Sequence, residues 1–198
     1  MDLGTTMVRG VVGPLLMGHG AQKLWGSFGG HGPEGTGGFF ESLGLRPGVR
    51  HAKAAGWAEF GGGLLVTLGA LTPLGSTLLT STMVTAIRKV HGSKGPWATE
   101  GGWEYNATII AIAGLLADIG PGAPSVDDVL FPDMHGKGWA IAALLAGVAG
   151  SYVATSPALS EAPADAPAAD VKLHGDPAAA DADESRFVRD QEHIGQSG

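Results

Sequence analysis

The chain has 198 residues, of which 44 % are hydrophobic and only 16 % are charged, and its formal net charge is −7. Residues 157–198 hold nine acidic and three basic residues, so this tail supplies −6 of the total and residues 1–156 are close to neutral. There is no cysteine, which excludes disulfides, thiol catalysis and cysteine-ligated metal or iron–sulfur sites. No motif for phosphate binding, nucleic-acid binding or serine hydrolysis is present, so nucleic acid is not an expected partner.

The first apolar segment, at residues 3–25, is long enough to cross a bilayer but contains four strongly polar side chains. A membrane-spanning helix needs about 20 mostly apolar residues. This one includes Arg9, His19, Gln22 and Lys23. Polar groups inside a span are energetically unfavourable, so they usually face a partner, a cavity or a functional site. We therefore expect the first helix of a membrane bundle, with its His19–Lys23 end directed toward a site.

Further apolar segments are separated by loops rich in glycine and proline. We expect spans at residues 51–72, 76–90, 103–120 and 138–155. The apolar stretch at residues 39–45 is too short to span and is expected to lie at the membrane interface. The sequence thus predicts an all-α, polytopic membrane helix bundle in contact with the lipid bilayer.

The domain organisation follows from these segments. We expect a four-helix core at residues 3–121, a loop at 122–137, a fifth C-terminal span at 138–155 and a tail at 156–198. The tail is rich in Ala, Pro and Asp and has few large apolar residues, so it cannot bury enough surface to offset its conformational entropy. It is therefore expected to be a disordered acidic tail.

Polar side chains from four of the expected spans fall at the same end of the bundle. At 1.5 Å per residue, His19 lies about 9 Å from the end of the first span and Glu59 about 10 Å into the antiparallel second span, so they reach one depth. Lys89 ends the third span on the same side. The candidate binding residues are His19, Gln22, Lys23, Glu59, His91, Glu104, Tyr105 and Asn106. Glu59 and His19 are the candidates for catalysis, because acids and bases grouped in a low dielectric suit proton transfer or headgroup binding.

Structural interpretations compete with these functional ones. Glu59 could serve only as an ion pair with Lys23 or Arg88 that holds helices together, since buried charges usually occur in pairs. His19 could simply donate a hydrogen bond between helices. At the opposite end of the bundle, Arg9 and Asp118 lie at matching depth, and we expect a structural pair there.

Haem bound between His19 and His91 is an alternative that the depths disfavour, because His91 ends its span whereas His19 lies about two turns inside. The sequence predicts no other metal site.

Several short motifs, in order along the chain, resemble the DoxX family of small integral membrane proteins over residues 6–130. The motifs are His19-Gly20-x-Gln22-Lys23, Gly35-Thr36-x-x-Phe39-Phe40 with Leu43-Gly44, Glu59-Phe60-x-Gly62-Gly63 and Gly101-Gly102-x-Glu104-Tyr105-Asn106. The resemblance implies four spans, so the fifth span and the tail are additions. It also implies a link to the small membrane subunit of thiosulfate:quinone oxidoreductases. Some members are linked to a membrane oxidoreductase complex with a superoxide dismutase and a sulfurtransferase.

Two functions follow as hypotheses. The first is an integral membrane subunit of a redox complex that binds a quinone headgroup near His19, Glu59 and Tyr105 or anchors a soluble oxidoreductase. Such a chain would be, if an enzyme at all, an accessory subunit of a quinone-linked oxidoreductase that receives electrons from elsewhere. The second is a non-enzymatic membrane scaffold or small-solute channel in which the polar cluster is purely structural.

Overall fold

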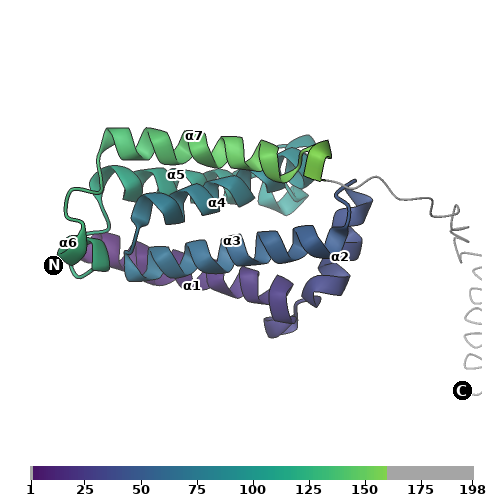
Figure 1. Ribbon diagram of the computed structural model, residues 1–198, viewed down its shortest axis with the longest axis horizontal. Coiled ribbons are helices and arrows are strands. Elements are labelled where there is room, and N and C mark those ends of the chain that lie inside the picture. Colours follow the sequence, from purple (N-terminus) through teal and green to yellow (C-terminus); the bar gives the residue numbers. More distant parts are fainter. Residues whose placement is uncertain (1, 160–198) are drawn as a thin grey trace, which may run out of the picture. The chain divides into compact units, whose positions relative to one another are not determined.

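The computed structural model describes residues 2–159, and this part of the chain is all-helical (Figure 1), which confirms the all-α part of the predicted fold class. The α-helices are α1 (Leu3–Trp25), α2 (Gly32–Ser42), α3 (Gly48–Leu68), α4 (Thr72–Ala86), α5 (Glu104–Ile119), α6 (Val126–Leu130) and α7 (Lys137–Ala154). A π-helical segment, Ile87–His91, continues α4. From residue 160 onward, the predicted tail lies outside the described residues.

Helices α1 and α3 run antiparallel and pack directly against each other, at the lower side of the bundle in Figure 1. Glycine makes this close approach possible. A Cβ atom built on Gly20 would lie 2.6 Å from the carbonyl oxygen of Gly56, and one on Gly13 would lie 2.7 Å from that of Gly63. Small residues of this kind let helix backbones meet in membrane proteins. The contact places the end of α1 beside the middle of α3, where Glu59 lies.

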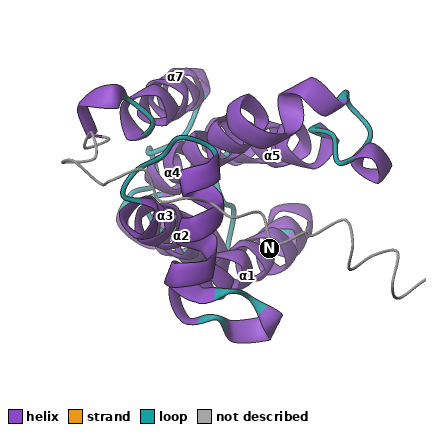
Figure 2. Cartoon of the chain, turned by 90° about the vertical axis from the view of Figure 1, so that its right-hand side faces the viewer, coloured by secondary structure: helices purple, strands orange, loops and turns teal. Residues whose placement is uncertain are grey.

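Helices α4, α5 and α7 form the other side of the bundle (Figures 1 and 2). α7 packs on both α4 and α5. Two hydroxyls join α4 to α7, since Thr85 Oγ1 donates to Ser151 Oγ at 3.0 Å. Arg88 also reaches α7, where its guanidinium lies 3.6 Å from the ring centroid of Tyr152 and donates to Ser151 Oγ at 2.9 Å. The fifth predicted span is therefore an integral part of the packed bundle.

The bundle has a hydrophobic core, but it also buries several hydroxyl side chains and exposes many large apolar ones. The side chains of Thr72, Ser76 and Thr80 on α4 are completely buried, and Ser76 Oγ donates to the carbonyl oxygen of Ala113 at 2.8 Å. Large apolar side chains lie exposed on the outside of every long helix. Soluble proteins place most Ser and Thr outside and most Leu and Val inside. Exposed apolar side chains of this kind are expected where lipid surrounds a helix bundle.

Length and composition single out one helix of the described part, α7, as able to cross a membrane. α4 and α5 have 15 and 16 residues and are shorter than a typical span. α1 and α3 are long enough, at 23 and 21 residues, but contain glycines and charged side chains.

The expected pair between Arg9 and Asp118 is not formed among the described residues. Arg9 is 3 % exposed and donates from Nη2 to the carbonyl oxygen of Pro124 at 2.6 Å and from Nη1 to that of Thr67 at 3.4 Å. Thr67 lies in the last turn of α3, where backbone carbonyls have no partner within the helix. The prediction from depth along the helices gave the wrong partner for Arg9. The loop after α5 folds back over this end of the bundle and supplies the carbonyl oxygen of Pro124 instead.

Asp127 is the buried acid at this end of the bundle, with only 2 % of its surface exposed. One carboxylate oxygen accepts from the backbone N–H of Leu71 at 2.7 Å, and the other accepts from that of Thr72 at 2.8 Å. Asp127 therefore caps the start of α4 from a distant loop, which satisfies N–H groups that have no partner within the helix. This loop, residues 122–137, contains the short helix α6.

Candidate functional site

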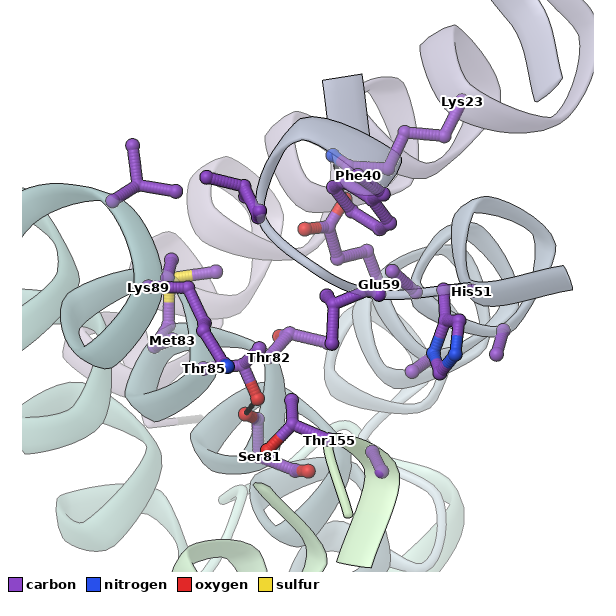
Figure 3. Close-up of a pocket in the computed structure, with 18 of the residues that line it drawn as sticks. Lys23, Phe40, His51, Glu59, Ser81, Thr82, Met83, Thr85, Lys89 and Thr155 are labelled. Atoms are coloured by element: carbon purple, nitrogen blue, oxygen red, sulfur yellow. Dashed lines mark hydrogen bonds and ion pairs between the residues drawn. The ribbon is translucent and has the colours of Figure 1, made fainter. Parts of the chain in front are cut away.

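A cavity of about 680 Å³ lies at the end of the bundle where α1 ends and α3 begins (Figure 3). Residues of α1, α2, α3, α4 with its π-helical continuation, and α5 form its walls, and the end of α7 completes them. Its volume falls within the range of about 300–1,000 Å³ that is usual for small-molecule sites.

Six of the eight residues selected from the sequence line this cavity. They are His19, Lys23, Glu59, His91, Tyr105 and Asn106. Gln22 and Glu104 do not line it, because each is engaged with a neighbouring loop. The Gln22 side-chain amide donates to the carbonyl oxygen of Phe28 at 3.4 Å, and Glu104 accepts from the backbone N–H of Ala98 at 2.8 Å. These two residues shape the loops beside the cavity.

Lys23 and Glu59 form an ion pair on the cavity wall, with 2.5 Å between Lys23 Nζ and Glu59 Oε2. Glu59 is 7 % exposed, so its charge needs such a partner. Lys23 Nζ also donates to the carbonyl oxygen of His19 at 3.3 Å. Of the two partners expected for Glu59, the structure selects Lys23, since Arg88 is turned toward α7.

Aromatic and amide side chains stand beside this ion pair. The rings of His19 and Tyr105 have centroids 6.3 Å apart and are tilted by 58°. Asn106 is buried, and its Nδ2 donates to Met83 Sδ at 3.4 Å. α1, α4 and α5 therefore all contribute hydrogen-bonding or aromatic groups to the part of the cavity around Glu59.

His91 ends the π-helical segment that follows α4. Its Nδ1 is 2.7 Å from the carbonyl oxygen of Gly101, and this hydrogen bond orients the ring. Single-turn π segments are frequent at functional sites. Lys89 on the same segment also lines the cavity.

The cavity has polar lining residues that the sequence analysis did not select. They are Arg50, His51, Ser81, Thr82, Thr85 and Thr155. α2 adds Phe39 and Phe40, which the sequence placed at the membrane interface. A signal was available for His51, because residues 51, 54, 55, 58 and 59 have the spacing of one helix face and all five line the cavity. In the described part of the chain, no group of three or more His, Asp or Glu side chains is arranged to hold a metal ion.

The fold and the cavity define the class of protein: an all-helical bundle with a cavity at one end that both apolar and polar side chains line. Residues 4–92 match the model of the DoxX family, from the start of α1 through the π-helical segment, and this match supports a membrane protein. The motif at residues 101–106 lies beyond the matched segment. No curated protein and no solved structure matches the chain.

Proposed function

We propose that this chain is a multi-pass integral membrane subunit of a redox complex in the bacterial plasma membrane, and that its cavity binds the headgroup of a quinone. The observation that carries the proposal is the cavity of about 680 Å³ in which Lys23, Glu59, His19 and Tyr105 converge within largely apolar walls. A small, flat polar headgroup on an apolar tail matches such a site, which needs few polar groups for orientation.

The outer surface of the bundle supports several membrane crossings. Exposed apolar side chains on α1 recur every fourth residue, and a second row follows α7. The α1 row is Leu3, Met7, Val11 and Leu15, and the α7 row is Ile141, Leu145, Val148 and Tyr152. Rows of this length would face acyl chains. Exposed Trp25, Trp57 and Trp97 occur toward the cavity end, and tryptophan is enriched where a membrane meets water.

The polar groups of the cavity have the chemistry that quinone reduction needs. A quinone takes up two electrons and two protons to become a quinol. Glu59 and His19 would relay protons to the quinone, because a carboxylate and an imidazole can each bind and release a proton. The electrons would come from a separate redox protein docked on the bundle. A superoxide dismutase and a sulfurtransferase are the partner classes that the resemblance suggests.

The test compares electron-donor-driven quinone reduction in membranes that contain wild type or Glu59→Gln. We expect the rate to fall by about 100-fold or more, the usual contribution of a general acid or base. Glu100→Gln is the matched control, because Glu100 is exposed and does not line the cavity. An unchanged rate at equal protein level would contradict a proton-transfer role.

A non-enzymatic scaffold or small-solute channel is the second candidate, and the Lys23–Glu59 ion pair favours it. The pair joins α1 to α3 and satisfies a buried carboxylate, so it has a structural effect whatever the cavity binds. On this hypothesis Glu59→Gln lowers the thermal stability and abundance of the protein, and the rate per folded molecule stays constant.

A further inference from the structure

His51 is a cavity-lining residue with a buried nitrogen that has no hydrogen-bond partner in the described part of the chain. That atom is Nε2 of the ring, and Figure 3 shows the ring at the wall of the cavity. Buried polar atoms are nearly always hydrogen-bonded, and each exception calls for an explanation such as a bound ligand. The free Nε2 therefore marks a second polar point in the cavity, apart from the Lys23–Glu59 ion pair.

The two polar points lie on one face of α3 with an alanine surface between them. His51 and Glu59 are eight residues apart, which corresponds to about 12 Å along the helix axis. Residues 54, 55 and 58, all alanine, line the cavity between them. This part of the wall has no polar side chain, so an apolar ring could lie against it with a polar group at each end.

The rise of about 12 Å along the axis of α3 from His51 to Glu59 is similar to the length of a para-quinone with one donor at each end. Two carbonyl groups on opposite sides of a six-membered ring, each accepting a hydrogen bond of about 2.8 Å, span about 11 Å between the donor atoms. Quinone oxygens accept hydrogen bonds, so each end of the ring needs a donor. The Lys23 ammonium, held by Glu59, supplies one donor, and the Nε2–H tautomer of His51 supplies the other.

We propose that His51 is a quinone-binding residue: its Nε2–H donates to the carbonyl remote from Lys23, and the ring lies against the alanine surface of α3. This inference rests on the proposed function and specifies the ligand as a quinone with its carbonyls in para positions. It also assigns the two hydrogen bonds to two separate elements, the end of α1 and the start of α3.

The test is calorimetric titration of the full-length protein in detergent with two probes. The first is 1,4-naphthoquinone, and the second is 1-tetralone, a bicyclic ketone with a single carbonyl. In wild type we expect the quinone to bind roughly tenfold more tightly than the ketone. A roughly tenfold difference is the upper end of what one hydrogen bond contributes. His51→Ala should lower the quinone affinity by about the same factor and leave that of the ketone unchanged. His51→Gln should restore part of the loss, because its amide is also a donor.

The outcomes distinguish this inference from the proposal on which it rests. If wild type binds neither probe, quinone binding itself is overturned, and the role of His51 with it. If wild type binds the quinone and His51→Ala binds it equally well, or loses both probes to the same extent, the role of His51 alone is overturned. His135→Ala is the matched control, because His135 is exposed at the opposite end of the bundle and should leave both affinities unchanged.

Discussion

The two ends of the bundle both bury charged side chains, but they satisfy them in different ways. At the end where α1 begins, Arg9 and Asp127 bond to backbone groups at the end of α3, in the loop before α6 and at the start of α4. At the cavity end, Lys23 and Glu59 pair with each other on the wall of a space of about 680 Å³. Backbone partners are fixed by the fold, so the side chains that bond to them at the first end are not available to bind a ligand.

The comparison shows that a buried charge in a membrane helix does not identify a site by itself. Arg9 is more deeply buried than Lys23, yet it donates its hydrogen bonds to backbone carbonyl oxygens, one of them in the last turn of α3. The identity of the partners and the presence of an adjoining cavity separate the two cases. Substitutions at the first end should therefore change stability alone, and substitutions at the second should change ligand binding as well as stability.

The largest effect on stability is expected from Asp127→Ala. It removes the acceptors of two buried N–H groups at the start of α4, and we expect a loss of about 2–4 kcal/mol in the free energy of unfolding. Thermal unfolding in detergent measures the change. Asp128→Ala, one residue along the same short helix, is the control, since Asp128 is exposed. A melting temperature equal to that of wild type in Asp127→Ala would contradict the proposal that this end of the bundle has a structural role.

The next effect is expected from Gly20→Ala, which tests whether the α1–α3 contact holds the cavity end together. The added methyl would lie 2.5 Å from the backbone nitrogen of Phe60, so the helices must separate at a cost of about 1–3 kcal/mol. The melting temperature and the quinone affinity should both fall. Gly18→Ala is the control, because a Cβ there meets nothing within 4 Å. Equal behaviour of the two variants would argue against close packing at Gly20.

A smaller effect is expected from Lys23→Met, which leaves Glu59 without its ion-pair partner. Because the two side chains are 22 % and 9 % exposed, we expect a loss of about 1–2 kcal/mol, less than for a fully buried pair. Adding Glu59→Gln should recover much of this loss, and unfolding of the two single variants and the double variant measures the coupling. Additive losses would mean that the two groups do not stabilise each other.

The smallest effect is expected from Tyr152→Leu, which removes the ring under Arg88. An exposed cation–π contact contributes about 0.5–1 kcal/mol, so the melting temperature should fall slightly and quinone affinity should stay constant. Val153→Leu is the control on the same exposed part of α7. A large loss of quinone binding in Tyr152→Leu would extend the functional end of the bundle to α7.

The sequence by itself located the long helices and the depth of their polar residues, but not α2 and α6. The first span was predicted at residues 3–25 and forms Leu3–Trp25, and the last was predicted at 138–155 and forms Lys137–Ala154. Apolar length and flanking Gly and Pro residues are local properties, so they can be read without knowledge of the neighbours. The rise per residue then predicted that His19 and Glu59 lie at one depth. In the structure, both residues line the cavity, His19 from α1 and Glu59 from α3.

Only the tertiary structure decided which polar groups meet. Rotation of each helix about its axis and the paths of the loops are not set by depth. Gln22 and Glu104 therefore turn to loops, whereas His51 faces the cavity. Arg9 bonds to the chain before α6, which lies 115 residues away at Pro124, a contact that no local pattern encodes. Long-range packing of this kind selects one arrangement because each buried polar group must find a partner at the same time.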